Sequence, residues 1–313
     1  MRGWRDIASS WRKLNLSDAE TLTADWKRRS DQLQTTLAKS IDANTKREKK
    51  PAYIGPLPGA TLTFWESMQQ EHPSEQQWPH RCYAELLQPG VLSPEQANTV
   101  IDCMRAYGAT TLGVVANVER PHPTGRDILG FISYGYAQEL LRLDRIEEYI
   151  LFLYAHRYHD HSRGSWTAGE VSGITGGGAL FCIPAQQTIP LLVRWLLVYE
   201  NSDEDRLYFG RAIPRAWTAT GKPIAIEQAP TRWGRVSYRL EPRGDNQLVA
   251  TITLPERGEL PGELHVSFRL PASKTLNTLT ANGMPVVAGG RWKDAAVFPT
   301  HGERKFEVVA TAG

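Results

Sequence analysis

A chemically rich loop separates two strongly hydrophobic segments of this chain. The stretch HDHSRGSWTAGEVSGITGGG, residues 159–178, holds histidines, an aspartate, Trp166 and a single glutamate, Glu170. A loop that only joins two helices usually needs two to eight residues, so this one is longer than joining requires. A glycine-flanked glutamate with a tryptophan nearby can offer a carboxylate and a flat apolar platform for a sugar ring. Glu170 is the first candidate for a catalytic residue, and Trp166 for a substrate-binding one. The alternative for Glu170 is a helix N-cap or a solvated loop carboxylate.

Acid/base chemistry by carboxyl groups usually needs a pair of them, and two residues are candidates for the second. Asp127 lies in TGRDILGFISYGY, where we expect it at or just before the start of a helix. The helix dipole alone favours an acidic residue at such a position, so a purely structural role stays open. Glu66 lies in LTFWESMQQEHP beside Trp65. Its alternative is an ordinary exposed glutamate next to buried aromatic residues.

Several aromatic and imidazole side chains near these carboxylates are candidates for binding sugar rings and hydroxyl groups. Besides Trp166, they are Trp65, Tyr134, Tyr136, His159 and His161. Tyr134 follows Asp127 by seven residues, so the two side chains share a helix face if the helix already includes Asp127.

The same region raises the question of a metal site. His156 and Asp160 are four residues apart, as two ligands on one helix face would be, and His159 and His161 lie beside them. Against a metal, the sequence contains no HExxH pattern, and the end of a helix favours histidine through the dipole alone. We therefore expect no metal and no cofactor, and interpret the imidazoles as sugar-binding or packing groups.

Composition excludes several functional classes. The 313 residues carry a net charge of +2, which gives no indication of a nucleic-acid or membrane partner. The three cysteines form no CxxC pair, so neither a disulfide framework nor a zinc motif is expected. The longest apolar run, residues 188–199, is too short to cross a bilayer and contains Arg194. The N-terminal residues lack the apolar region of a signal peptide.

Hydrophobic periodicity predicts helices in the first two thirds of the chain. Helices are expected over residues 4–14, 16–44, 92–108, 127–141, 145–159 and 184–200. Ser17 and Glu20 are expected to form a capping box, and Ser93 to cap the helix that begins with Pro94. The helix over 145–159 is expected to bury a stripe formed by Leu143, Ile146, Ile150, Leu153 and Arg157. The last helix is apolar nearly all round, so we expect it to be buried on every side.

Beyond about residue 203 the hydrophobic period changes from 3.6 to 2. The segments QLVATITL, LHVSFRL and KFEVVA alternate, and turn residues lie between them. Short strands at such spacing are typical of an antiparallel β-sandwich. We therefore predict an α+β chain, with a helical-hairpin domain over residues 1–202 and a C-terminal β-sandwich over residues 203–313.

Three stretches of the chain resemble the C-terminal part of six-hairpin glycosidases, the superfamily that includes α-L-rhamnosidase-like hydrolases. They are YGYAQELLRLDRIEEYILFLYAHRYHDHSRGSWTAGE, IPAQQTIPLLVRWLLVYE and GRAIPRAWTATGKPIAIEQAPTRWGRVSYRLEP. The most specific motif is GSWTAGE, residues 164–170, which is similar to a Gly-x-x-Thr-x-x-Glu segment late in the helical toroid of such enzymes. The resemblance implies an (α/α)6 toroid with attached β-sandwich domains, and carboxylate acid/base hydrolysis of a plant or microbial polysaccharide.

A complete toroid has twelve helices, whereas the sequence predicts about seven. The resemblance therefore implies only the later half of a toroid, completed by an upstream helical half or by a partner chain. It also suggests a periplasmic or extracellular location, although the chain shows no signal peptide.

Two alternative functions remain open at this point. Polysaccharide lyases also combine an α/α toroid with β domains, and Tyr134, Tyr136, His156 or Arg157 could supply the groups for β-elimination. The other alternative is a non-catalytic fragment or a carbohydrate-binding module. An exposed apolar patch on the early helices would favour the fragment, since absent neighbours would cover it.

Overall fold

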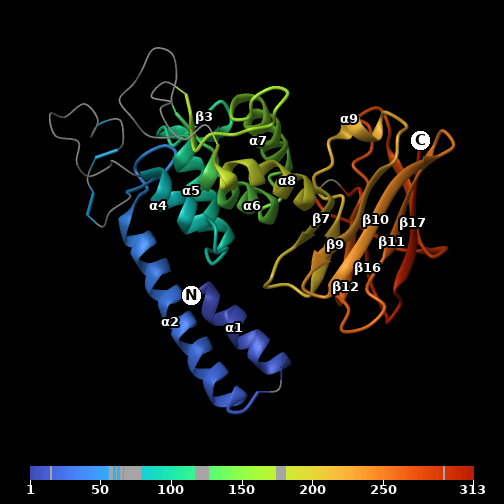
Figure 1. Ribbon diagram of the computed structural model, residues 1–313, viewed down its shortest axis with the longest axis horizontal. Helices are drawn as coiled ribbons and strands as arrows, with labels where there is room; N and C mark the ends of the chain where they lie inside the picture. Colours follow the sequence, from blue (N-terminus) through green and yellow to red (C-terminus); the bar gives the residue numbers. More distant parts are fainter. Residues whose placement is uncertain are drawn as a thin grey trace. The chain divides into compact units, whose positions relative to one another are not determined.

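The computed structural model describes residues 1–14, 16–55, 59–60, 62–63, 66, 79–116, 127–173, 181–291 and 293–313 (Figure 1). The chain forms two compact units. Unit 1 comprises residues 1–143 and 154–188, and unit 2 comprises residues 144–153 and 189–313. The structure is thus of mixed α and β class, with helices and two larger β-sheets among the described residues.

Unit 1 opens with an antiparallel pair of helices, α1 (Arg2–Lys13) and α2 (Ala19–Asn44), which lie side by side in Figure 1. Trp11 and Trp26 join them through an edge-to-face contact with ring centroids 5.7 Å apart. The predicted capping box at Ser17 is wrong. Asp18 is the N-cap of α2 and adopts a left-handed conformation with φ of 59°, and its side chain makes no capping hydrogen bond. The backbone turn therefore positions this helix start.

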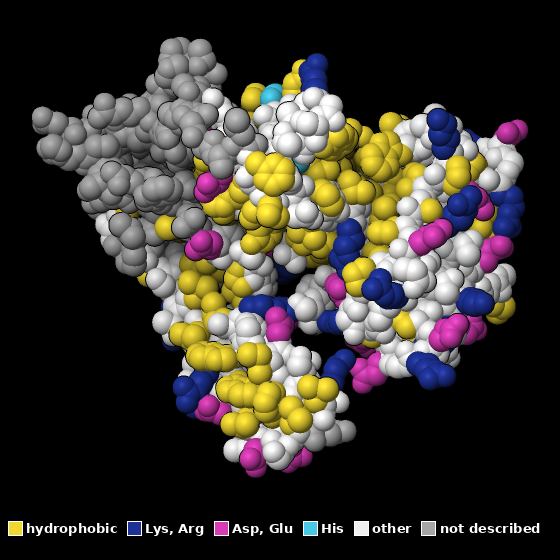
Figure 2. All heavy atoms as spheres, viewed as in Figure 1, with side chains coloured by type: hydrophobic (Ala, Val, Ile, Leu, Met, Phe, Trp, Pro, Cys, Tyr) yellow, Lys and Arg dark blue, Asp and Glu magenta, His cyan; other side chains and the backbone are white. Residues whose placement is uncertain are grey.

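The α1–α2 pair keeps large apolar side chains on its surface. The exposed ones are Ile7, Leu14, Leu16, Leu22 and Leu33, and Figure 2 shows hydrophobic side chains gathered over this part of the molecule. Surface apolar residues on this scale can mark a contact face.

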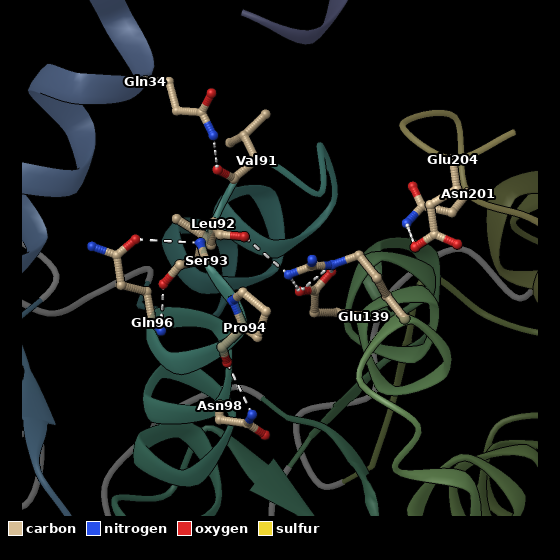
Figure 3. A network of polar contacts seen from close by, with 11 residues as sticks. Gln34, Val91, Leu92, Ser93, Pro94, Gln96, Asn98, Glu139, Asn201 and Glu204 are labelled. Carbon is tan, nitrogen blue, oxygen red and sulfur yellow. Dashed lines mark hydrogen bonds and ion pairs between the residues drawn. The ribbon is translucent and has the colours of Figure 1, made fainter. Parts of the chain in front are cut away.

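Helices α4 (Pro79–Leu87) and α5 (Pro94–Ala106) follow in unit 1. The predicted cap at Ser93 is confirmed: its Oγ accepts a hydrogen bond from the backbone N–H of Gln96 at 3.2 Å. The Gln96 side chain in turn accepts from the backbone N–H of Ser93, which completes a capping box (Figure 3). Gln34 of α2 donates to the carbonyl of Val91 at 2.6 Å, so polar contacts fix the segment that enters α5.

The predicted helix over 127–141 begins later than expected. Residues Ile128–Leu129 form strand β5, a 3₁₀ turn covers Gly130–Ile132, and helix α6 spans Tyr134–Arg142. The backbone of β5 pairs with strand β6 (Val171–Ser172), so its hydrogen-bonding groups are already used and the helix cannot start there. Asp127 is consequently not at a helix start, and it does not share a helix face with Tyr134.

Helix α7 (Ile146–His159) agrees with its predicted range, but its buried stripe is rotated. Ile146, Tyr149, Phe152 and His156 are fully buried, whereas Ile150 and Arg157 of the predicted stripe are only partly buried. The large aromatic side chains therefore determine which face points inward, and this brings His156 into the interior.

Helix α8 (Ile183–Leu197) is not buried on every side as predicted. Ile183 is 63% exposed, and Gln187 and Pro190 are also exposed. The helix ends at Leu197, where strand β7 (Val198–Glu200) begins.

The β part of unit 2 consists of two sheets with strand orders β14-β13-β17-β11-β10-β9 and β15-β16-β12-β8-β7. A short helix, α9 (Arg215–Thr218), follows β8. Besides β7, the strands of these two sheets are β8 (Arg206–Phe209), β9 (Ile224–Thr231), β10 (Gly234–Arg243), β11 (Gln247–Thr253), β12 (Glu263–Ser267), β13 (Leu276–Ala281), β14 (Met284–Pro285), β15 (Val287–Gly289), β16 (Ala295–Pro299) and β17 (Lys305–Ala312). The pair β8–β12 is parallel, which corrects the prediction of a wholly antiparallel arrangement.

Aromatic contacts join the two sheets. Phe209 of β8 stacks on Tyr238 of β10, and Phe298 of β16 meets Phe306 of β17, each with ring centroids 5.4 Å apart. Along β17 the buried residues alternate with exposed or partly exposed ones, as a strand with one face in a core requires. Among the described residues, no helix combines the length and hydropathy needed to cross a membrane.

Candidate functional site

The chemically rich loop of unit 1 is anchored by the short ribbon of β5 and β6. In this antiparallel pair Ile128 lies opposite Ser172, and Leu129 lies opposite Val171. Asp127 immediately precedes β5, and Glu170 immediately precedes β6. Two candidate carboxylates that are far apart in sequence are thus carried by the opposite ends of one ribbon.

The register gives the scale of their separation. Ile128 and Ser172 lie opposite each other. Asp127 precedes Ile128 by one residue and Glu170 precedes Ser172 by two, so the two positions are offset by three residues along the strands. At about 3.3 Å per residue this corresponds to roughly 10 Å along the ribbon. The environments also differ, since Asp127 is 1% exposed whereas Glu170 is exposed.

Trp166 lies in a tight turn of the same loop. Ser162 donates its backbone N–H to the carbonyl of Thr167 at 2.8 Å, and the two side-chain hydroxyls are 2.6 Å apart. Trp166 itself has a left-handed φ of 58° and is 54% exposed. The Arg157 guanidinium carbon lies 3.8 Å from the centroid of its ring, a cation–π contact that orients the indole. The loop therefore presents a fixed aromatic surface.

Beneath this turn, His156, Asp160 and His161 form a buried cluster. Their side chains are 0%, 0% and 1% exposed. His156 Nε2 lies 3.5 Å and His161 Nδ1 lies 4.0 Å from Asp160 Oδ2. The other carboxylate oxygen, Oδ1, accepts a hydrogen bond from Ser172 Oγ at 2.6 Å. The cluster thus links the end of α7 to strand β6.

Burial controls the charge of this cluster. Burial lowers the pKa of His156 to about 3, with a smaller contribution from the neighbouring His161. It raises the pKa of Asp160 to about 6, against the Ser172 hydrogen bond, which lowers it. Burial also lowers the pKa of His161, although the backbone carbonyls of His156 and Gln186 oppose this shift. At neutral pH the cluster therefore holds one carboxylate and two uncharged imidazoles.

The local sequence explains why these groups meet. His156 lies on the buried stripe of α7, and Asp160 continues that helix by donating its backbone N–H to the His156 carbonyl at 3.0 Å. Gly130 gives the carboxylate its space, because a Cβ atom there would collide with Asp160. An isolated bridge pairs His161 with Ala168 and turns the loop back toward β6.

The other predicted site residues have varied surroundings. Tyr134 is partly buried, and its hydroxyl interacts with Gln88 Nε2 at 3.0 Å. Tyr136 is buried in α6, His159 is exposed beside Tyr158, and His161 is buried in the cluster. Trp65 lies outside the described residues.

The carboxylate of Glu66 already has strong partners. Its Oε2 accepts a hydrogen bond from the backbone N–H of Thr63 at 2.7 Å, and its Oε1 pairs with Lys49 Nζ at 2.9 Å. The Thr63 backbone, followed by Lys49, lowers the pKa of Glu66 to about 2. Such a group stays ionised at neutral pH and cannot act there as a general acid.

Sequence reasoning missed two residues that position the site, Gly130 and Ser172, and it did not predict that Asp160 is buried. The four-residue spacing of His156 and Asp160 was a visible signal. The contact between Asp160 and Ser172 had none, because it depends on the pairing of two-residue strands.

No protein-family model and no curated protein sequence matches this chain. It is similar to several solved structures. One is a GH127 β-L-arabinofuranosidase from Geobacillus stearothermophilus T6, with 14% identity and a TM-score of 0.35 over 82% of this chain and 47% of that one. Another is the Streptomyces avermitilis α-L-rhamnosidase in complex with L-rhamnose, with 13% identity and a TM-score of 0.42 over 99% of this chain and 25% of that one. A third, described as a glycoside hydrolase, has 10% identity and a TM-score of 0.40 over 99% and 55%. The chain therefore spans about half, or less, of the length of the structures it matches.

Proposed function

We propose that this chain is part of a glycoside hydrolase in which Glu170 and Asp127 are the two carboxyl groups that flank the scissile bond. The observation that supports this proposal is the pairing of β5 with β6, which joins the segments that carry the two residues. Inverting glycosidases separate their carboxyl groups by about 6.5–9.5 Å to leave room for water, whereas retaining ones need about 5–5.5 Å, so the anomeric configuration of the product reports which separation this pair has.

In this proposal the exposed Trp166 binds a sugar ring. Its indole lies four residues before Glu170 and is oriented by Arg157. Aromatic rings bind the apolar faces of sugars well, since they bury large areas at little entropic cost. Tyr134, Tyr136 and His159 are secondary candidates. Glu66 is the weaker alternative to Asp127, because its low pKa leaves it only the role of a base.

The larger architecture belongs to the same proposal. Helices of residues 1–202 would form part of an α/α toroid, completed by further helices from an upstream half or a partner chain, with residues 203–313 as the attached β domain. The exposed apolar residues of α1 and α2 support a missing neighbour. β-Elimination by a lyase is the alternative, with the partly buried Tyr134 and Arg157 as the groups that would act.

The test is product release from a panel of polysaccharides and aryl glycosides, with β-L-arabinofuranosides and α-L-rhamnosides as the first substrates. Wild type should release reducing ends, and Glu170→Gln should reduce the rate by at least about 100-fold. Glu227→Gln, an exposed glutamate on β9, is the matched control and should keep wild-type activity. Products that absorb in the ultraviolet as unsaturated uronates would instead indicate a lyase. Full activity of Glu170→Gln would reject Glu170 as a catalytic residue.

A further inference from the structure

The buried cluster of His156, Asp160 and His161 has the composition of a metal site. Two imidazoles and one carboxylate each offer one ligand atom, and these three atoms all lie within 4.8 Å of one another. Imidazole nitrogen and carboxylate oxygen are common ligands of zinc and of related first-row divalent ions. All three residues belong to unit 1, so the cluster is formed within a single compact unit.

The distances fit a bridging ion better than direct hydrogen bonds. A charge-assisted hydrogen bond would bring nitrogen and oxygen to about 2.7–2.9 Å, whereas the distances to Asp160 Oδ2 are 3.5 Å from His156 and 4.0 Å from His161. In a tetrahedral zinc site with bonds of about 2.0–2.2 Å, neighbouring ligand atoms lie about 3.3–3.5 Å apart. The three ligand atoms lie within 4.8 Å of one another, so the side chains need to close by at most roughly 1.5 Å to hold such an ion.

One oxygen of the cluster has no hydrogen-bond partner among the described residues, namely Asp160 Oδ2. The His161 ring interacts only weakly with the backbone carbonyls of His156 and Gln186, at geometry outside that of a normal hydrogen bond. Within the part of the chain that the structure describes, the basic side chains beside the Asp160 carboxylate are His156 and His161, both uncharged at neutral pH. A buried carboxylate beside uncharged imidazoles is costly, and a cation would neutralise it.

A hydrogen bond from outside the cluster orients the Asp160 carboxylate. Ser172 Oγ donates to Asp160 Oδ1 at 2.6 Å and leaves Oδ2 directed at the two imidazoles. Gly130 permits the carboxylate to approach the backbone at this point. Metal-binding carboxylates are typically oriented by such hydrogen bonds, and losing one weakens metal binding by about 10–100-fold.

We propose that His156, Asp160 and His161 bind one divalent first-row transition-metal ion of the zinc class, and that this ion fixes the loop to α7 and β6. This reverses the expectation from the sequence that no metal is bound. The site is structural: it ties the end of α7, through Asp160 and Ser172, to the strand that follows Glu170. This proposal does not depend on whether the chain hydrolyses glycosides.

The experiment uses the full chain without a histidine tag, stripped with a chelator and then titrated with Zn²⁺ by calorimetry. Wild type should bind one equivalent and unfold at a higher temperature when loaded. Asp160→Asn should lose this binding, Ser172→Ala should bind about 10–100-fold more weakly, and His159→Gln, an exposed neighbouring histidine, should bind like wild type.

Cobalt absorption then identifies the ligands. A visible d–d spectrum without a thiolate charge-transfer band is expected for nitrogen and oxygen ligands, and a thiolate band would assign the ion to a cysteine and overturn the proposal. Folded wild type that binds no stoichiometric zinc would also overturn it. If Asp160→Asn does not fold, Ser172→Ala decides: unchanged affinity in that variant contradicts the site.

Discussion

The two units of this chain have interiors of different chemistry. The sheets of unit 2 enclose mostly apolar side chains, such as Phe209, Val266 and Phe268, which are completely buried. Unit 1 buries many polar groups as well, including Asp127, Glu139 and the cluster around Asp160. An apolar core needs only the right pattern and volume, whereas each buried polar group needs a specific partner. Unit 1 is therefore the part in which single residues determine local structure, and it also carries the candidate site.

The largest expected effect tests the apolar interior of unit 2. Phe209→Ala removes a fully buried ring stacked on Tyr238 and should lower the free energy of unfolding by about 3–5 kcal/mol. Met284→Ala, on the exposed strand β14, is the control and should change it by less than about 0.5 kcal/mol. Chemical denaturation followed by circular dichroism measures both. Equal effects of the two substitutions would show that the sheets do not share a packed core.

The next prediction concerns the polar interior of unit 1. Glu139 is buried and forms a close ion pair with Arg142, which also donates to the carbonyl of Leu92 at 3.0 Å (Figure 3). Arg142→Ala should destabilise the protein by about 3 kcal/mol, because it leaves a buried carboxylate without its guanidinium. The double variant Arg142→Met with Glu139→Leu should recover most of this loss in the same denaturation assay. A double variant as unstable as the single one would contradict this explanation.

The sequence predicts more of unit 2 than of unit 1, because an apolar pattern is visible in a sequence whereas the specific partner of a buried polar group is not. Alternation located β11, β12 and β17, because a half-buried sheet imposes a period of two on its residues. The Ser93 cap was also predictable, since its contacts are local. The parallel pairing of β8 with β12 was not, because it joins strands that are distant in sequence.

The candidate site was predictable only in part. Glu170, Trp166 and Asp127 attract attention by residue type and local context. The ribbon of β5 and β6 has two residues in each strand, too few for any periodic signal. The burial of His156 was missed because the predicted stripe of α7 counted Ile150 and Arg157 instead of Tyr149 and Phe152. Tertiary packing, which a single helix pattern cannot show, decides between such adjacent stripes.

A smaller effect is expected at Gly130. A Cβ atom there would meet the Asp160 carboxylate and lie 3.1 Å from the Ala185 side chain. Gly130→Ala should therefore destabilise unit 1 by about 1–3 kcal/mol and weaken zinc binding. Gly3→Ala, in α1 with open space around it, is the control and should be neutral or slightly stabilising. Thermal unfolding with and without zinc measures both; a harmless Gly130→Ala would argue against a tightly packed cluster.

The smallest effect concerns acid stability at Glu66. Its pKa is lowered to about 2 in the folded chain from an ordinary value of 4.5. The unfolded state therefore binds more protons between these values, so the stabilisation is present above pH 4.5 and is lost as the pH falls toward 2. Glu66 is partly exposed, so the loss in Glu66→Gln should stay below about 1 kcal/mol. Denaturation at a series of pH values should show a shallower acid slope for this variant, and an unchanged slope would contradict its contacts with the Thr63 backbone and Lys49.

The most direct test of the central claim is a double-mutant cycle on kcat/KM with Glu170→Gln, Asp127→Asn and the combination, using a glycoside that the wild type hydrolyses. Two carboxyl groups that act on one bond should each be nearly indispensable, so each single variant should lose at least about 100-fold. The double variant should then be no worse than the worse single one, because catalytic groups that act as a unit are not additive. Losses that multiply, or variants as active as wild type, would show that the ribbon of β5 and β6 does not carry a catalytic pair.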